Sequence, residues 1–268
     1  MFEKIVVPLD GSTVANSAVG VAASIARASA APLEILSFVT DEQDPIGRES
    51  FLRAHVGDLG DLEAQYKIIQ LEGDAAQALV GELNDEPGDL LVMTTRGVGR
   101  MGAVLGSVAE TVVRDAHHPI LIVGPHVAAD CPAIVDGRLV AFVDGSEAAE
   151  TSLPIATQWA LAYGMTPSIA QVIDLGVTDP AYSSDTEYVG ELADQYTEVS
   201  GHQFEHEVIY QKDAADAIVG HLDKDGAALG IMTTHCRTGI ARFVLGSVAM
   251  RVVHQAPCPI LLSRPVQI

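Results

Sequence analysis

Residues 104–125 spell Val104-Leu-Gly-Ser-Val-Ala-Glu-Thr-Val-Val-Arg-Asp-Ala-His-His-Pro-Ile-Leu-Ile-Val-Gly-Pro125, and residues 244–265 repeat them as Val244-Leu-Gly-Ser-Val-Ala-Met-Arg-Val-Val-His-Gln-Ala-Pro-Cys-Pro-Ile-Leu-Leu-Ser-Arg-Pro265. Thirteen of the 22 positions are identical. Upstream, Val7-Pro-Leu-Asp-Gly-Ser12 recurs as Ala141-Phe-Val-Asp-Gly-Ser146. The repeat distance is about half of the 268-residue chain and far longer than a solenoid repeat. We therefore expect two whole domains, at residues 1–126 and 137–268, joined by a linker of small residues.

Composition narrows the classes of function. The formal net charge of −21 argues against nucleic acid or an acidic membrane surface as a partner. The sequence has no long apolar run free of charge, so no membrane insertion is expected. The three cysteines, Cys131, Cys236 and Cys258, show no disulfide or metal spacing, which favours a reducing cytoplasm.

Charge is unevenly distributed along this acidic chain. No acidic residue occurs from Gly226 to Ile268 or from Leu90 to Ala109, although both stretches carry arginines. Buried parallel strands exclude carboxylates and explain much of this depletion. They do not explain the arginines outside the strands, which favour a local anion site.

Each copy alternates short apolar runs with longer amphipathic ones. The predicted strands are 4–9, 33–39, 65–71, 89–95 and 119–123 in the first copy, and 138–143, 168–173, 204–210, 228–233 and 259–262 in the second. The predicted helices are 13–30, 75–84 and 107–116, then 147–163, 214–222 and 248–255, with a further helix and loop in each of 41–64 and 174–202. Such alternation predicts an α/β fold with βαβ units and a largely parallel sheet.

Asp10 and Asp144 each end a first strand and are followed by Gly-Ser. In open α/β sheets ligands bind at the carboxyl ends of the strands, where a carboxylate can accept hydrogen bonds from ribose hydroxyls or an adenine amine. Asp-Gly-Ser is equally typical of an Asx turn that leads into a helix. The residues alone do not decide between these two interpretations.

A glycine-rich loop, Gly97-Val-Gly-Arg-Met-Gly102, precedes Gly106-Ser107 and the following helix. Glycines let backbone N–H groups approach a phosphate, and a helix N-terminus attracts anions. Alternatively, Ser107-Val-Ala-Glu110 is a capping box that satisfies those donors internally. The second copy keeps Gly-Ser but has Met250 in place of the glutamate, which favours a ligand role. The loop lacks the Gly-Lys-Ser/Thr ending of a Walker A motif.

Together these motifs resemble the universal stress protein family in its tandem form, over essentially the whole chain. The resemblance rests on Val-Pro-Leu-Asp-Gly-Ser, on Met-Thr-Thr-Arg-Gly and on Leu-Gly-Ser-Val-Ala followed by Pro-Ile-Leu. It implies two Rossmann-like domains, each a five-stranded parallel sheet of order 3-2-1-4-5 flanked by helices. That order places Asp10 and the glycine-rich loop on the two strands beside the topological switch point.

The resemblance also implies an ATP site in each copy, because the nucleotide-binding branch of the family carries Gly-x2-Gly-x9-Gly-Ser/Thr. The first copy has Thr94-x2-Gly97-x8-Gly106-Ser107, and the second has Thr233-x2-Cys236-x9-Gly246-Ser247. The implied contacts in the first copy are Pro8, Asp10, Val39, Met93, Thr94, Arg96, Gly97, Gly99, Arg100, Gly106, Ser107 and Val108. Those in the second copy are Asp144, Val172, Met232, Thr233, Arg237, Gly246, Ser247 and Val248.

The expected function is therefore that of a cytoplasmic stress-response protein that binds ATP, with or without Mg²⁺, and is not an enzyme. The alternatives are a nucleotide-free interaction module of the same fold, or an adenine-nucleotide-using hydrolase or adenylyl transferase. The last strands of the two copies are apolar, which predicts an intrachain pseudo-dimer and allows a homodimer. A regulatory protein partner is expected but not identified. No metal site is expected, because His202-x3-His206 has no third ligand nearby in the sequence.

Overall fold

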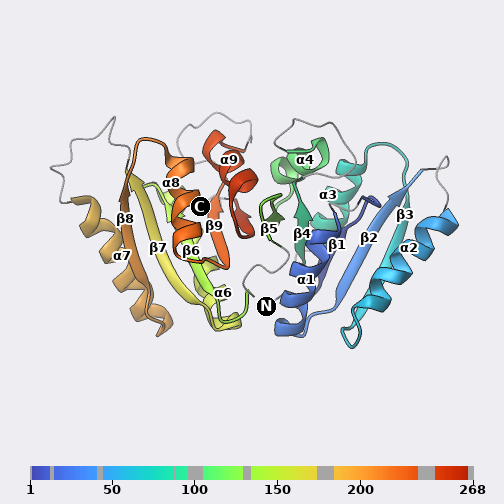
Figure 1. Cartoon of the computed structure of the whole chain (residues 1–268), viewed down its shortest axis with the longest axis horizontal. Helices are drawn as coiled ribbons and strands as arrows, with labels where there is room; N and C mark the ends of the chain where they lie inside the picture. The colour runs from blue at the N-terminus through green and yellow to red at the C-terminus, as the bar shows by residue number, and fades with distance from the viewer. Residues whose placement is uncertain are drawn as a thin grey trace. The chain divides into compact units, whose positions relative to one another are not determined.

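The structure is a computed structural model, and it describes residues 2–12, 15–40, 45–86, 88–95, 105–128, 134–173, 184–234 and 245–264. The chain divides into two compact units, Met1–Pro125 and His126–Ile268. Strands and helices alternate in both units (Figure 1). The α/β class predicted from the repeated pattern is thus confirmed.

Unit 1 contains one parallel sheet. Its elements are β1 (Ile5–Pro8), α1 (Asn16–Ser29), β2 (Leu33–Val39), α2 (Pro45–Asp58), β3 (Ala64–Gln70), α3 (Ala75–Asp85), β4 (Leu90–Thr94), α4 (Ser107–Asp115) and β5 (Ile120–Val123). The strands lie in the order β3-β2-β1-β4-β5, as predicted. Every strand pair in this order is parallel.

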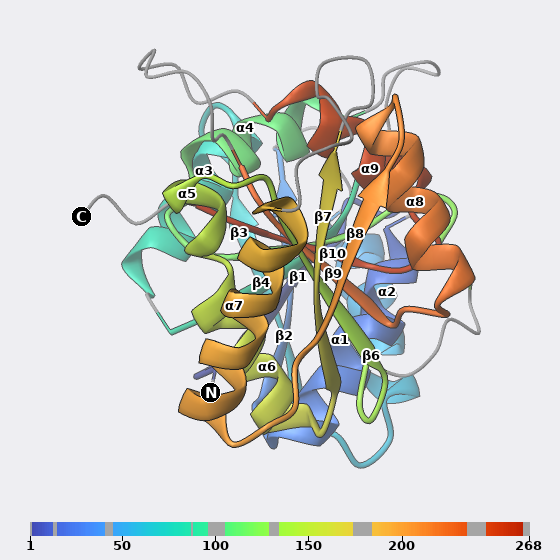
Figure 2. The ribbon, with the colours of Figure 1, turned by 90° about the vertical axis from the view of Figure 1, so that its left-hand side faces the viewer.

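Unit 2 repeats this topology. Its elements are β6 (Arg138–Val143), α5 (Glu147–Glu150), α6 (Leu153–Tyr163), β7 (Thr166–Ile173), α7 (Ser184–Ser200), β8 (Glu205–Tyr210), α8 (Ala214–Lys224), β9 (Leu229–Thr233), α9 (Ser247–Gln255) and β10 (Ile260–Ser263). The strand order is β8-β7-β6-β9-β10, again with parallel pairs. Figure 2 shows α6 and α7 on one face of this sheet and α8 and α9 on the other.

The single helix predicted over 147–163 is wrong, because it is broken into α5 and α6. Ser146 caps α5 by accepting a hydrogen bond from the Ala149 N–H at 3.2 Å. Pro154 stands in the first turn of α6. A proline there has no N–H to lose and a backbone angle suited to the first turn, whereas inside a continuous helix it would remove a hydrogen bond. The proline therefore fixes the start of a second helix.

The central strands are buried on both faces, as parallel sheets require. Ile5 and Val7 of β1 and Leu139 of β6 are completely inaccessible to solvent. Trp159 and Tyr163 are also buried, with ring centroids 5.1 Å apart, which confirms ordinary core packing on α6. This core holds the carboxyl ends of β1 and β4 in fixed positions.

The topological switch point lies between β1 and β4 in unit 1, and between β6 and β9 in unit 2. The chain leaves β1 through α1 to β2 on one side, and leaves β4 through α4 to β5 on the other. The two connections therefore diverge at the carboxyl ends of these strands. In sheets of this kind the divergence creates the crevice where ligands bind.

Candidate functional site

Asp10 lies two residues beyond β1, at the switch point of unit 1. Its Oδ1 accepts a hydrogen bond from the Ser12 N–H at 2.9 Å, and Ser12 Oγ accepts one from the Ala15 N–H at 3.2 Å. The Asx-turn interpretation of Asp-Gly-Ser is therefore confirmed. Gly11 completes the turn with a φ of +87°. Because Asp10 remains exposed, the turn leaves its carboxylate accessible from solvent.

The helix that follows β4 begins close to this turn. The Gly106 N–H donates to the Thr95 carbonyl at 2.8 Å, so the start of α4 is fastened to the end of β4. Thr94, the last residue of β4, is 7% exposed. Strand, helix start and Asp10 turn therefore meet at one edge of the sheet.

The capping box predicted around Ser107 does not form. The N-cap of α4 is Gly106, with φ −72° and ψ 154°, and among the described residues no side chain caps this helix. Ser107 is the first helical residue, so its hydroxyl lies inside the first turn rather than before it. Ser107 and Val108 are exposed. The first turn thus presents backbone N–H donors and the positive end of the helix dipole without a capping side chain.

Unit 2 has the same arrangement at α9. Gly246 is the N-cap, with φ −58° and ψ 151°, and no described side chain caps the helix. A Cβ added to Gly246 would meet no atom of the described residues within 4 Å, so none of these residues would obstruct a side chain there. Asp144 follows β6 and accepts from the Ser146 N–H at 3.1 Å. The uncapped helix beside an aspartate turn therefore occurs twice.

The structure adds Arg48 to the site of unit 1, which sequence reasoning missed. A Cβ added to Gly11 would lie 2.5 Å from Arg48 Nη1, so the guanidinium of α2 rests on the Asp10 turn. Glycine is favoured there by its φ of +87°, which side chains rarely adopt. Arg48 lies in the segment 41–64, for which only a helix and a loop were predicted. Its positive charge was the only sequence signal that could have indicated a role at an anion site.

The equivalent turn of unit 2 has different neighbours. Tyr188 of α7 donates to Glu150 Oε1 at 2.7 Å. Burial, the Glu150 carboxylate and Asp144 together raise the pKa of the Tyr188 hydroxyl well above its ordinary value. Gln171 Nε2 would lie 3.6 Å from a Cβ on Gly145. Besides its own aspartate, the unit 2 turn therefore has the Glu150 carboxylate near it, where unit 1 has an arginine.

The remaining expected contacts fall into three groups. Pro8 and Val39 end β1 and β2 at the site edge, and Met93 and Met232 are the buried residues before Thr94 and Thr233. The strand register makes Ile173, not Val172, the counterpart of Val39. Pro8 pairs with Leu36, and its counterpart Phe142 pairs with Ala170. Val39 and Ile173 each lie three residues beyond these partners. Outside the described residues lie Arg96, Gly97, Gly99, Arg100 and Arg237.

Comparison with known proteins gives a consistent result over the whole length. The sequence model of the universal stress protein family matches residues 1–124 and 137–264. A universal stress protein of Thermus aquaticus, encoded in the QAH/OAS sulfhydrylase 3′ region, is 31% identical over 137 residues, which are 46% of this chain and 99% of the relative. A universal stress protein of Archaeoglobus fulgidus has a solved structure with a TM-score of 0.78 at 15% identity, covering 99% of this chain and 100% of that one.

A second solved structure, a putative universal stress protein from Pseudomonas aeruginosa, has a TM-score of 0.69 at 16% identity and covers 98% of this chain and 94% of that one. At these identities the two structures support the fold alone. No helix in the described part of the chain is both long and apolar enough to span a bilayer.

Proposed function

The chain belongs to the universal stress protein family, and from that premise we propose that it is a cytoplasmic stress-response protein that binds ATP at the switch point of each unit. The observation that carries the proposal is the pair of uncapped helix N-termini at Gly106 and Gly246. Each lies at the carboxyl edge of the sheet, where an aspartate follows the neighbouring strand.

The parts of the site suit the parts of a nucleotide. The backbone N–H groups of the first turn of α4, together with the helix dipole, attract phosphate oxygens. Asp10 accepts hydrogen bonds from ribose hydroxyls or from an adenine amine. Arg48, on the other side of the Asp10 turn, adds a positive charge for the phosphates.

We propose binding without efficient turnover. At the described part of the site, the groups beside the helix start are a buried threonine, an exposed serine and an aspartate held in a turn. None of these described groups pairs a nucleophile with a base, as covalent catalysis would require.

For unit 2, a nucleotide-free interaction role is a second candidate. Each turn has its own aspartate, but unit 2 adds the Glu150 carboxylate near it, so a triphosphate would meet one more negative charge there than in unit 1. Without a described arginine such as Arg48 to offset this charge, its repulsion weakens anion binding. We therefore expect unit 1 to bind ATP more tightly than unit 2.

The test is native mass spectrometry of the purified chain followed by calorimetric titration with ATP–Mg²⁺, with GTP and cAMP as comparison ligands. The expected result is saturable ATP binding with one tight and one weaker site, and a rise in melting temperature. At 100 times the dissociation constant, ATP should stabilise its unit by about 2.7 kcal/mol. Absence of both heat and thermal shift with ATP would overturn the proposal.

A further inference from the structure

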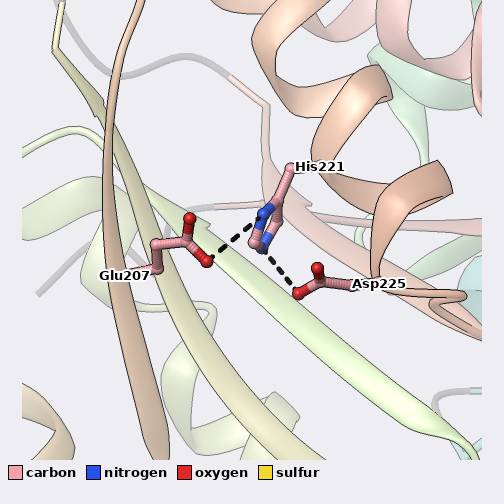
Figure 3. A group of neighbouring side chains, drawn as sticks. All are labelled: Glu207, His221 and Asp225. Carbon is pink, nitrogen blue, oxygen red and sulfur yellow. Dashed lines mark ion pairs between the residues drawn. The ribbon is translucent and has the colours of Figure 1, made fainter.

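We propose that Glu207, His221 and Asp225 bind one divalent transition-metal ion at the amino-terminal side of the unit 2 sheet. Glu207 lies on β8, His221 on α8, and Asp225 directly after α8 (Figure 3). These residues lie before β9 begins, at the edge opposite the carboxyl ends where the proposed nucleotide site lies. The inference is therefore independent of ATP binding.

The imidazole of His221 is buried but poorly satisfied. Its side chain is only 3% exposed, and within the described part of the chain its Nε2 has no hydrogen-bond partner. Asp225 Oδ2 lies 3.5 Å from Nε2, and Glu207 Oε2 lies 3.7 Å from Nδ1. A buried nitrogen without a partner destabilises the fold, and a bound ion would remove that cost.

The three side chains gather at one place, but Glu207 faces the ring Nδ1 and Asp225 faces the ring Nε2 (Figure 3). One ligand atom from each can be chosen so that all lie within 4.8 Å of one another. An ion at the centre of such a triangle is at most about 2.8 Å from each atom, whereas zinc–ligand distances are about 2.0–2.2 Å. Binding of one ion also requires one carboxylate to move toward the nitrogen that the other one faces. The Glu207 side chain is 43% exposed and has room to make this movement, whereas the His221 ring is buried.

The charge at the cluster also favours a dication. Arg138 donates to Glu205 Oε2 at 2.6 Å, and its Nε is 3.4 Å from Asp225 Oδ2. With a neutral imidazole, the carboxylates of Glu205, Glu207 and Asp225 therefore outnumber the one guanidinium by two charges. A divalent ion neutralises that excess, whereas a proton on His221 would neutralise half of it.

Unit 1 shows what the cluster of unit 2 lacks. The register aligns Lys67 of β3 with Glu207, and Glu82 and His221 are each the eighth residue of their helices. In unit 1 the strand lysine forms an ion pair with the helix glutamate. In unit 2 the strand residue is acidic and the helix residue is a histidine, so this strand–helix contact has no permanent cation of its own. A bound cation would restore the balance.

The ligand set selects the class of ion. One imidazole nitrogen with two carboxylate oxygens suits Zn²⁺ and its neighbours Co²⁺ and Mn²⁺. Mg²⁺ and Ca²⁺ prefer sites made of oxygen ligands alone. The site is therefore expected to discriminate against these two ions.

The experiment uses the full chain stripped with a chelator and then titrated with Zn²⁺ by calorimetry and with Co²⁺ by visible absorption. One ion per chain should bind, with the absorption of a nitrogen- and oxygen-ligated Co²⁺. Glu207→Gln and Asp225→Asn should each weaken binding at least about tenfold, and His221→Gln should abolish it. The matched control is His206→Gln, which removes an exposed histidine one position from Glu207. It should leave the affinity unchanged.

Folding of each variant is checked by circular dichroism. If His221→Gln does not fold, Glu207→Gln keeps the test valid, because the Glu207 side chain is partly exposed and its replacement disturbs the core less. Binding of one Zn²⁺ that persists in Glu207→Gln and Asp225→Asn would place the ion elsewhere and overturn the proposal. So would the absence of stoichiometric Zn²⁺ binding, or equal affinity for Mg²⁺. In those cases the cluster is a histidine paired with two carboxylates.

Discussion

Replacing Gly246 by aspartate should stabilise the protein and at the same time remove one ATP site. Gly246 is the N-cap of α9 with a φ of −58°, so a side chain causes no backbone strain. A Cβ there meets no described atom within 4 Å. The new carboxylate can accept hydrogen bonds from the first-turn N–H groups, which is the role that aspartate plays at many helix starts.

The magnitude follows from the cap and from the dipole. Aspartate is a better N-cap than glycine by a few tenths of a kcal/mol, and a negative charge at a helix N-terminus adds about 0.3–1 kcal/mol. We expect a gain of about 0.5–1 kcal/mol in the free energy of unfolding of unit 2. The melting temperature should rise by roughly 2–4 °C. A bound triphosphate uses the same donors, so the carboxylate competes with it and repels it.

The assay combines scanning calorimetry without ligand and titration with ATP–Mg²⁺. Gly246→Asp should reduce the ATP stoichiometry from two to one, and adding Gly106→Asp should eliminate binding. Gly246→Ala is the matched control, because alanine caps poorly and carries no charge. It should lower stability by about 0.5 kcal/mol and retain the site. An aspartate variant that is more stable yet still binds two ATP molecules would refute a phosphate role for these donors.

Three further results are expected. Lys4→Met should lower the free energy of unfolding in urea at pH 7 by about 3 kcal/mol, because the Asp89 side chain, 4% exposed, loses a cation 3.3 Å away. Lys67→Met is the control: it breaks an exposed ion pair and should lower the free energy of unfolding by under about 1 kcal/mol. Burial lowers the pKa of Lys4, but the Glu34 and Asp89 carboxylates outweigh this effect, so the net pKa is raised. In the unaltered protein the stabilisation by the Lys4 ion pairs should therefore be complete at neutral pH and be lost only above about pH 10.5. Unfolding measured over a pH series would test this. Arg48→Gln should weaken ATP binding to unit 1 several-fold in calorimetry and reduce its salt dependence. Separately expressed halves should associate in sedimentation analysis, as the apolar last strands predict, and monomeric halves at high concentration would exclude the internal dimer.

Much of the fold was predictable because it depends on local patterns. The strands 33–39 and 138–143 have their predicted limits, since each is an apolar run that follows a turn. Asp74 is of a residue type favoured at helix N-caps, and its Oδ1 accepts hydrogen bonds from the Ala76 and Gln77 N–H groups at 3.0 Å. The repeated motif fixed the order of strands through its resemblance to a family. In each case the deciding information lies within a few residues of sequence.

The missed features depend on contacts between distant segments. Whether Ser107 or Gly106 is the N-cap of α4 depends on the hydrogen bond from Gly106 to Thr95, which a capping-box pattern does not contain. Arg48 approaches Gly11 because α2 returns along β2 and β3. No metal site was expected from His202-x3-His206, because no third ligand is nearby in the sequence. The residues that gather in the structure are Glu207, His221 and Asp225, which come from a strand, a helix and the residue after that helix.

The two units differ most where their shared fold does not constrain them. Where unit 1 has the ion pair of Lys67 and Glu82, unit 2 has Glu207 and His221. Where Arg48 lies beside the aspartate turn of unit 1, Tyr188 and Glu150 lie near the turn of unit 2. Both units nevertheless begin the last helix with an uncapped glycine. A serine or aspartate at that position would stabilise the helix, so retaining glycine twice leaves a small stabilisation unused. The proposed nucleotide, which would need the uncapped N–H groups, accounts for an uncapped glycine at both sites although the neighbouring charges differ.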